Sequence, residues 1–154
     1  MGNISWSYLD KRSAAIAALK DYSSMQFIIN HTDEDILDIR QEMTGVGSPA
    51  PDGMPHAHDP QSGEERVVDA LDEIDVLKER YRQALEYMDW FKPAWDFLSE
   101  DERFVLESFY TDENYYGANA AFYVAAHFKV EQASAYRKKN RALEHLTVLL
   151  FGKA

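Results

Sequence analysis

Residues 98–106 read Leu-Ser-Glu-Asp-Glu-Arg-Phe-Val-Leu, and residues 132–146 read Gln-Ala-Ser-Ala-Tyr-Arg-Lys-Lys-Asn-Arg-Ala-Leu-Glu-His-Leu. In the first stretch Ser99 is followed three positions later by Glu102, which is the capping-box pattern of a helix start. The second stretch holds four basic residues, contains no proline or glycine, and repeats its apolar residues at helical steps. The sequence therefore predicts a helix that begins after Ser99 and a basic helix over about residues 132–150.

Two short segments lead from one of these helices to the other. Residues 118–128 are rich in alanine, which lets a neighbouring helix approach closely, and the tripeptide at 129–131 is long enough for a tight turn. We expect Val130 in that turn to enter the core. In the basic helix, the residues expected to face the core recur at steps of seven, four and three: Ala135, Ala142, Leu146 and Leu149. This order of elements is typical of a helix-turn-helix that reads DNA.

Charge is distributed unevenly along the chain. The 154 residues carry a net charge of −11, which argues against a general polyanion binder. Residues 129–154, however, hold six Lys/Arg and two acids, whereas residues 1–128 hold 10 Lys/Arg and 25 acids. The basic excess is therefore confined to the predicted last helix, where it would suit either DNA or a plain solvated face.

The candidate DNA contacts lie on the basic helix and in the turn before it. Four residues follow one another at steps of three, one and three, on a side that differs from the apolar one: Ser134, Arg137, Lys138 and Arg141. We expect these four to face the major groove together with Gln132, because arginine pairs with a guanine edge and glutamine with adenine. Lys129 and Lys139 are expected to neutralise phosphates.

The first half of the chain predicts two long helices. Before residue 44 the apolar residues recur at Met25, Ile29, Ile36, Ile39 and Met43, at helical spacing. After residue 64 the spacing is again three and four, over Val67, Leu71, Ile74, Leu77, Tyr81, Leu85 and Met88. Each helix has one apolar stripe and needs a partner to bury it, so residues 1–92 are expected to form an antiparallel, coiled-coil-like hairpin.

The two predicted helices are separated by a segment rich in helix breakers. Residues 44–64 hold four of the five prolines and four of the seven glycines, so a mobile loop is expected there. His56 and His58 lie in this loop without a third ligand at a fixed spacing, so no metal site is expected. Pro93 should end or kink the second helix, which places the boundary between the hairpin and a C-terminal head at residues 93–154.

Several classes of function are disfavoured by what the sequence lacks. The chain has no cysteine, so it has no disulfide and no thiolate ligand, and a cytoplasmic protein is expected. No apolar run reaches the roughly 20 residues that a membrane span needs. There is no spacing typical of a Ser/His/Asp triad and no glycine-rich phosphate loop, so neither an enzyme nor a cofactor is expected.

The C-terminal segments also resemble a known family. Residues 98–106 are similar to the start of region 4 of bacterial sigma factors. Residues 135–137, 141–143 and Leu146 resemble the recognition helix of the sigma-region-4-like regulators of phages and prophages, the ArpU type. Those regulators also carry a long N-terminal helical hairpin. Their leucine-rich ending closed by glycine is similar to residues 149–152. The resemblance covers about 55 residues. It implies an all-α protein that ends in a helix-turn-helix head and binds double-stranded DNA to regulate phage or prophage genes.

The acidic half of the chain leaves a second interpretation open. An acidic hairpin would repel DNA, so it is expected to contact protein, either a second copy in a homodimer or RNA polymerase. The alternative function is therefore a helical adaptor that binds RNA polymerase or another protein and has lost DNA binding. Salt-dependent binding to duplex DNA distinguishes the two.

Overall fold

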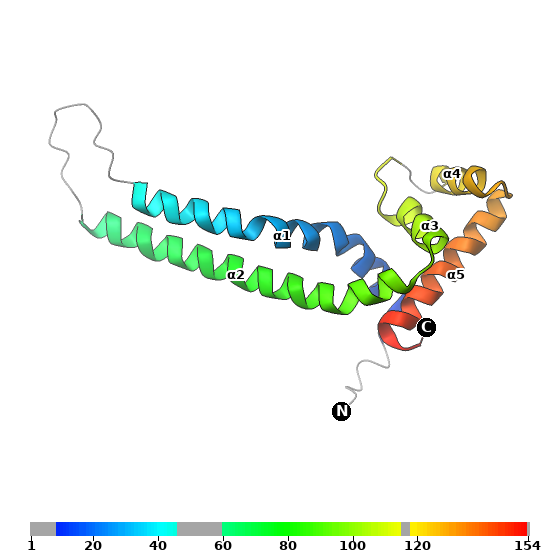
Figure 1. Cartoon of the computed structure of the whole chain (residues 1–154), viewed down its shortest axis with the longest axis horizontal. Coiled ribbons are helices and arrows are strands. Elements are labelled where there is room, and N and C mark those ends of the chain that lie inside the picture. The colour runs from blue at the N-terminus through cyan, green and yellow to red at the C-terminus, as the bar shows by residue number, and fades with distance from the viewer. Residues whose placement is uncertain (1–8, 46–59, 115–117, 154) are drawn as a thin grey trace. The chain divides into compact units, whose positions relative to one another are not determined.

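The computed structural model describes residues 9–45, 60–114 and 118–153, and all regular secondary structure within them is helical (Figure 1). The helices are α1 (Lys11–Gly45), α2 (Pro60–Phe97), α3 (Glu100–Tyr110), α4 (Ala118–Phe128) and α5 (Gln132–Phe151). The predicted all-α class is confirmed. The chain divides into two compact units: a terminal unit of Met1–Ser23 with Tyr87–Ala154, and a middle unit of Ser24–Glu86.

This division differs from the expected one at residues 92 and 93. The start of α1 and the end of α2 belong to the terminal unit, because they share one buried apolar cluster with α3 and α5. That cluster consists of Ala15, Ala18, Leu19, Phe91, Ala94, Trp95, Leu98, Leu106, Ala142, Leu143, Leu146 and Leu150. Pro93 does not end α2, which continues to Phe97. A proline removes one backbone hydrogen bond, and burial of Phe91 and Trp95 on either side outweighs that loss.

Helix ends in the terminal unit are closed by side-chain and backbone hydrogen bonds. The predicted capping box is confirmed: the hydroxyl of Ser99 accepts from the N–H of Glu102 at 3.2 Å, and the Glu102 carboxylate accepts from the N–H of Ser99 at 3.2 Å. Nη1 of Arg103 donates to the carbonyl of Leu98 at 3.0 Å, just after the end of α2. Gly152, with φ at 81°, closes α5 by donating its N–H to the carbonyl of Val148 at 2.7 Å.

A second apolar cluster joins α3, α4 and α5. Its buried members are Val105, Ala121, Val124, Ala125 and Ala135, and aromatic residues pack around them. The small side chains of α4 let the three helices approach closely, as the alanine content predicts. Val130 is half-buried and belongs to neither cluster, so its expected place in the core is wrong. It lies in the turn, where backbone hydrogen bonds rather than side-chain packing fix the chain.

In the middle unit, the parts of α1 and α2 lie side by side (Figure 1), and residues of both line one groove. On each helix a series of buried and half-buried residues alternates at steps of four and three, which is the coiled-coil spacing. On α1 these are Met25, Ile29, Thr32, Ile36, Ile39 and Met43, and on α2 they are Ala70, Ile74, Leu77, Tyr81 and Ala84.

The apolar stripe of α2 differs from the predicted one. Val67, Leu71 and Leu85 are 44%, 50% and 39% exposed, and Ala70 and Ala84 lie in the seam instead. Both stripes follow a repeat of about 3.5 residues, so spacing alone does not choose between them, and the side of α2 that lies against α1 decides which residues are buried. The loop expected at 44–64 is also shorter at both ends. Residues 44–45 belong to α1, which ends at Gly45, and residues 60–64 belong to α2, which begins at Pro60. Residues 46–59, which include both loop histidines, lie outside the described residues.

Candidate nucleic-acid interface

The connection between α4 and α5 is fixed by its backbone. Lys129 adopts a left-handed φ of 55°. Its N–H donates to the carbonyl of Ala126 at 3.3 Å, and the N–H of Val130 donates to the carbonyl of Ala125 at 3.0 Å. This pair of bonds is a Schellman motif, which glycine usually serves. Glu131 then precedes α5, and its carbonyl accepts from the N–H of Ser134 at 2.9 Å. The three-residue connection therefore sets the direction of α5 relative to α4.

Four of the predicted DNA contacts share one side of α5. Arg137 and Arg141 are exposed, and Ser134 and Lys138 are half-exposed, whereas Ala135 on the other side is fully buried. Among the described residues, neither arginine forms an ion pair with an acid, in contrast to Arg82, which pairs with two glutamates. Both guanidinium groups therefore keep their hydrogen-bond donors available to a ligand.

Lys138 and Arg141 also border a shallow cavity of about 260 Å³ between α3 and α5. The ammonium of Lys138 lies 4.6 Å from the ring centre of Phe128, the last residue of α4. Asp101 and Glu102, in the first turn of α3, line the same cavity. Acids and bases are therefore mixed at this edge of the interface, whereas Arg137 lies outside the cavity lining.

The Glu102 carboxylate is already engaged by protein groups. One oxygen accepts from the N–H of Ser99, and the other lies 2.6 Å from Nδ1 of His145 on α5. Partial burial raises the pKa of Glu102, but the hydrogen bonds from His145 and Ser99 outweigh burial and hold that pKa below its ordinary value. The carboxylate thus stays charged at neutral pH and connects α3 to α5.

The remaining predicted contacts lie elsewhere. Lys139 follows Gln132 by seven residues, so the two share a side of α5 that differs from the side of Arg137. The ammonium of Lys139 lies 5.4 Å from the ring centre of Phe109 and 5.4 Å from that of Tyr136. Burial, and secondarily the charge of Arg12, lowers the pKa of Lys139. Lys129 lies in the turn, exposed.

The sequence did not single out Arg12 or Asn140. Nη2 of Arg12, in the first turn of α1, donates to Oδ1 of Asn140 on α5 at 2.8 Å. The two residues are 128 positions apart, and both are exposed. No local pattern around residue 12 points to this contact, because only the packing of α1 in the terminal unit creates it.

The two units differ sharply in charge. The middle unit, Ser24–Glu86, holds five Lys/Arg and 15 Asp/Glu, which gives a net charge of −10. The terminal unit holds the remaining 11 Lys/Arg and 12 Asp/Glu, which gives −1. The acidity of the chain therefore resides almost wholly in the middle unit, and the unit that contains α5 is close to neutral.

Other kinds of site are not evident in the part of the chain that the structure describes. Among residues 9–45, 60–114 and 118–153, no three His, Asp or Glu side chains come together as a metal site would require. None of the helices in these ranges has the length and apolar character that crossing a membrane requires. No protein-family model, curated protein or solved structure matches the chain.

Proposed function

We propose that the chain is a sequence-specific DNA-binding regulator of transcription, sigma-factor-like, that acts on phage or prophage genes. In this proposal α4, residues 129–131 and α5 form a helix-turn-helix, and α5 is the recognition helix. The observation that carries the proposal is the pair Arg137 and Arg141, exposed and without an acidic partner on α5. The resemblance of residues 98–106 and 135–146 to sigma-region-4-like regulators supports the choice of target genes.

The chemistry of these side chains suits a major groove. An α-helix with its side chains is about 10–12 Å across, and the major groove of B-DNA is about 12 Å wide. Each guanidinium can donate two parallel hydrogen bonds to O6 and N7 of a guanine. Ser134 lies one turn before Lys138 near the start of α5, where it can donate to a base edge or a phosphate.

Charge supports the terminal unit as the DNA-binding part. Its net charge of −1 does little to oppose approach to a polyanion, whereas the −10 of the middle unit would be repelled. We therefore assign the middle unit, as an antiparallel hairpin, to protein contacts. A second copy of the chain or RNA polymerase would be its partner.

The second candidate is an adaptor that binds RNA polymerase or another protein and not DNA. Two observations favour it: the acidic middle unit and the surface of α4. Residues 118–128 contain no Asp, Glu, Lys or Arg, and Phe122 is 60% exposed. A first helix of this composition would suit a protein surface better than a DNA backbone, which attracts basic groups.

The deciding experiment measures binding of the full chain to labelled duplexes by fluorescence anisotropy over a series of salt concentrations. Phage promoter fragments are compared with a random-sequence duplex of the same length. For a DNA reader, the log of the binding constant should fall with the log of salt by about 0.9 per phosphate contact, and a promoter fragment should bind more tightly than the random duplex. Absence of binding at low salt, with capture of purified RNA polymerase, would support the adaptor instead.

A further inference from the structure

We propose that Arg12 of α1 is a phosphate contact at the edge of the DNA interface, with Asn140 as the residue that positions it. This inference rests on the proposed DNA binding and adds a part of the chain that lies far from the helix-turn-helix in sequence. Its starting point is the hydrogen bond of 2.8 Å from Nη2 of Arg12 to Oδ1 of Asn140. A second donor of Arg12 hydrogen-bonds the hydroxyl of Tyr110 on α3. An arginine has five N–H donors, so these two bonds leave donors for a phosphate.

Asn140 brings Arg12 next to the predicted groove-facing side. It follows Arg137 by three residues, so the two are neighbours on the surface of α5. Around α5 the basic side chains follow in the order Lys138, Arg141 and Arg137. Arg12, held by Asn140, lies next to Arg137 and so adds a fourth cation at the end of this row. A helix in the major groove has a phosphate backbone on each side, so cations on both flanks of α5 match that arrangement.

The local charges of Arg12 point to an anionic ligand. Arg12 lies close enough to Lys139 for its charge to lower the pKa of that lysine, although burial has the larger effect. Among the described residues, neither cation forms an ion pair with an acid. The neighbouring acid is Asp10, and its two oxygens accept from the N–H of Ser13 at 3.1 Å and from its hydroxyl at 2.8 Å. These bonds, and to a smaller extent the backbone N–H and the charge of Arg12, lower the pKa of Asp10, so Asp10 offsets part of the charge of Arg12.

Arg12 and Lys139 carry two positive charges against the one negative charge of Asp10, so an anion that approaches them would be attracted. A phosphate of the DNA backbone is the anion that the proposed function supplies. The competing explanation is that Arg12 only ties α1 to α5 through Asn140. The two explanations predict different results for a lysine at position 12, which keeps the charge and lacks the planar guanidinium.

The test uses the full chain and the same duplexes over the same salt series, with four variants. Arg12→Ala removes the charge and the hydrogen bond, Arg12→Lys keeps the charge, and Asn140→Ala removes the positioning partner. Arg40→Ala is the matched control, because Arg40 is an exposed arginine of the same helix in the middle unit. Melting temperatures of all variants are measured alongside to separate loss of fold from loss of contact.

We expect Arg12→Ala to make the salt slope shallower by about 0.9 and to weaken binding of promoter and random duplexes alike. Arg12→Lys should restore the slope, Asn140→Ala should weaken binding less than Arg12→Ala does, and Arg40→Ala should keep the wild-type slope. A slope for Arg12→Ala equal to that of Arg40→Ala would overturn the inference while DNA binding stands. The inference is equally overturned if Arg12→Lys matches Arg12→Ala in slope and both lose melting temperature. Wild-type chain that binds no duplex would refute the proposed function itself, and the inference with it.

Discussion

Nδ1 of His145 lies 2.6 Å from one carboxylate oxygen of Glu102, whose other oxygen accepts the N–H of Ser99 at 3.2 Å. One carboxylate thus caps α3 and connects it to α5. The pKa of Glu102 is held below its ordinary value of 4.5. A group with a lowered pKa in the fold contributes stability above its unfolded pKa and loses it as the pH falls through the folded value.

The first prediction concerns this carboxylate. Glu102→Gln keeps an acceptor for the N–H of Ser99 and loses the charge that faces His145. We therefore expect the unfolding free energy of Glu102→Gln to fall less than that of the wild type as the pH drops below about 4.5. Glu102→Ala also loses the acceptor for the N–H of Ser99, which is one half of the capping box, and should be less stable than Glu102→Gln at neutral pH. Urea midpoints from pH 7 to pH 3 measure both effects, and an unchanged pH profile for Glu102→Gln would contradict the assignment.

The second prediction tests the core of the terminal unit. Leu146 is fully buried, in the cluster that also holds Phe91 and Leu106, so Leu146→Ala should cost about 2–5 kcal/mol of unfolding free energy. Val148, two residues later on the same helix, is 40% exposed and serves as the control. Val148→Ala should cost less than about 1 kcal/mol. Equal losses in thermal or urea unfolding would mean that α5 packs with a different face.

The third prediction tests whether Leu71 lies in the seam of α2, as its apolar side chain predicts. Ile74 is 4% exposed in the seam of the middle unit, whereas Leu71 is 50% exposed beside it. Ile74→Ala should lower the unfolding free energy by about 2–5 kcal/mol, and Leu71→Ala by less than about 1 kcal/mol. The two variants are compared by urea unfolding followed by circular dichroism. A larger loss for Leu71→Ala would restore the stripe that side-chain size alone predicts.

The fourth prediction concerns the turn before α5. A left-handed conformation costs a residue with a side chain about 1–2 kcal/mol, and Lys129 adopts one with φ at 55°. Lys129→Gly removes that strain, and the greater freedom of glycine in the unfolded chain offsets about 0.4–1 kcal/mol of the gain. We expect a net stabilisation on the order of 0.5–1 kcal/mol, visible as a higher melting temperature. Lys129→Ala, which loses the same charge and keeps the strain, should show no such gain.

The fifth prediction compares two cations of α5 in DNA binding. Arg137 is exposed, so Arg137→Ala should leave the fold intact and cost on the order of 1–3 kcal/mol in specific binding. Lys139→Ala should instead weaken binding to all sequences alike and make the salt slope shallower by about one. Both are measured by anisotropy on promoter and random duplexes.

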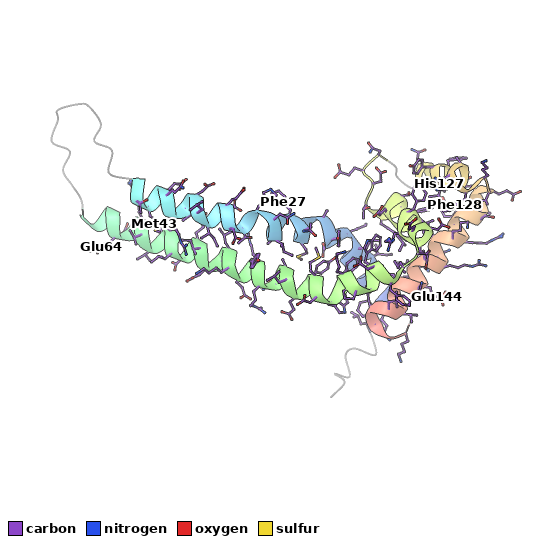
Figure 2. The ribbon with its side chains drawn as sticks, viewed as in Figure 1. Phe27, Met43, Glu64, His127, Phe128 and Glu144 are labelled. Carbon is purple, nitrogen blue, oxygen red and sulfur yellow. The ribbon has the colours of Figure 1, made fainter. Side chains whose placement is uncertain are left out.

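A matched control for that comparison is available on the same helix. Glu144 follows Arg137 by seven residues, shares its side of α5 and is exposed (Figure 2). Because it is acidic, Glu144→Ala should bind DNA at least as tightly as the wild type. If Glu144→Ala weakened binding as much as Arg137→Ala, this side of α5 would not be the one that meets DNA.

The sequence by itself determined what depends on neighbours along the chain. The capping box of Ser99 and Glu102, the glycine that closes α5 and the buried face through Ala135 and Leu146 were all readable, because each involves residues within one to three helical turns. The side of α5 that carries Arg137 and Arg141 followed from the same periodicity.

Only the tertiary structure decided which distant segments come together. Leu19 and Phe91 share the core of the terminal unit although they are 72 positions apart, so the unit boundary lies away from Pro93. The seam of α2 passes through Ala70 and not Leu71, because the side of α2 that lies against α1 is set by packing and not by the spacing, which both stripes share. Arg12 reaches Asn140 for the same reason. Contacts of this kind depend on how helices pack: the apolar periodicity of one helix shows which face is buried, but not which distant segment covers it.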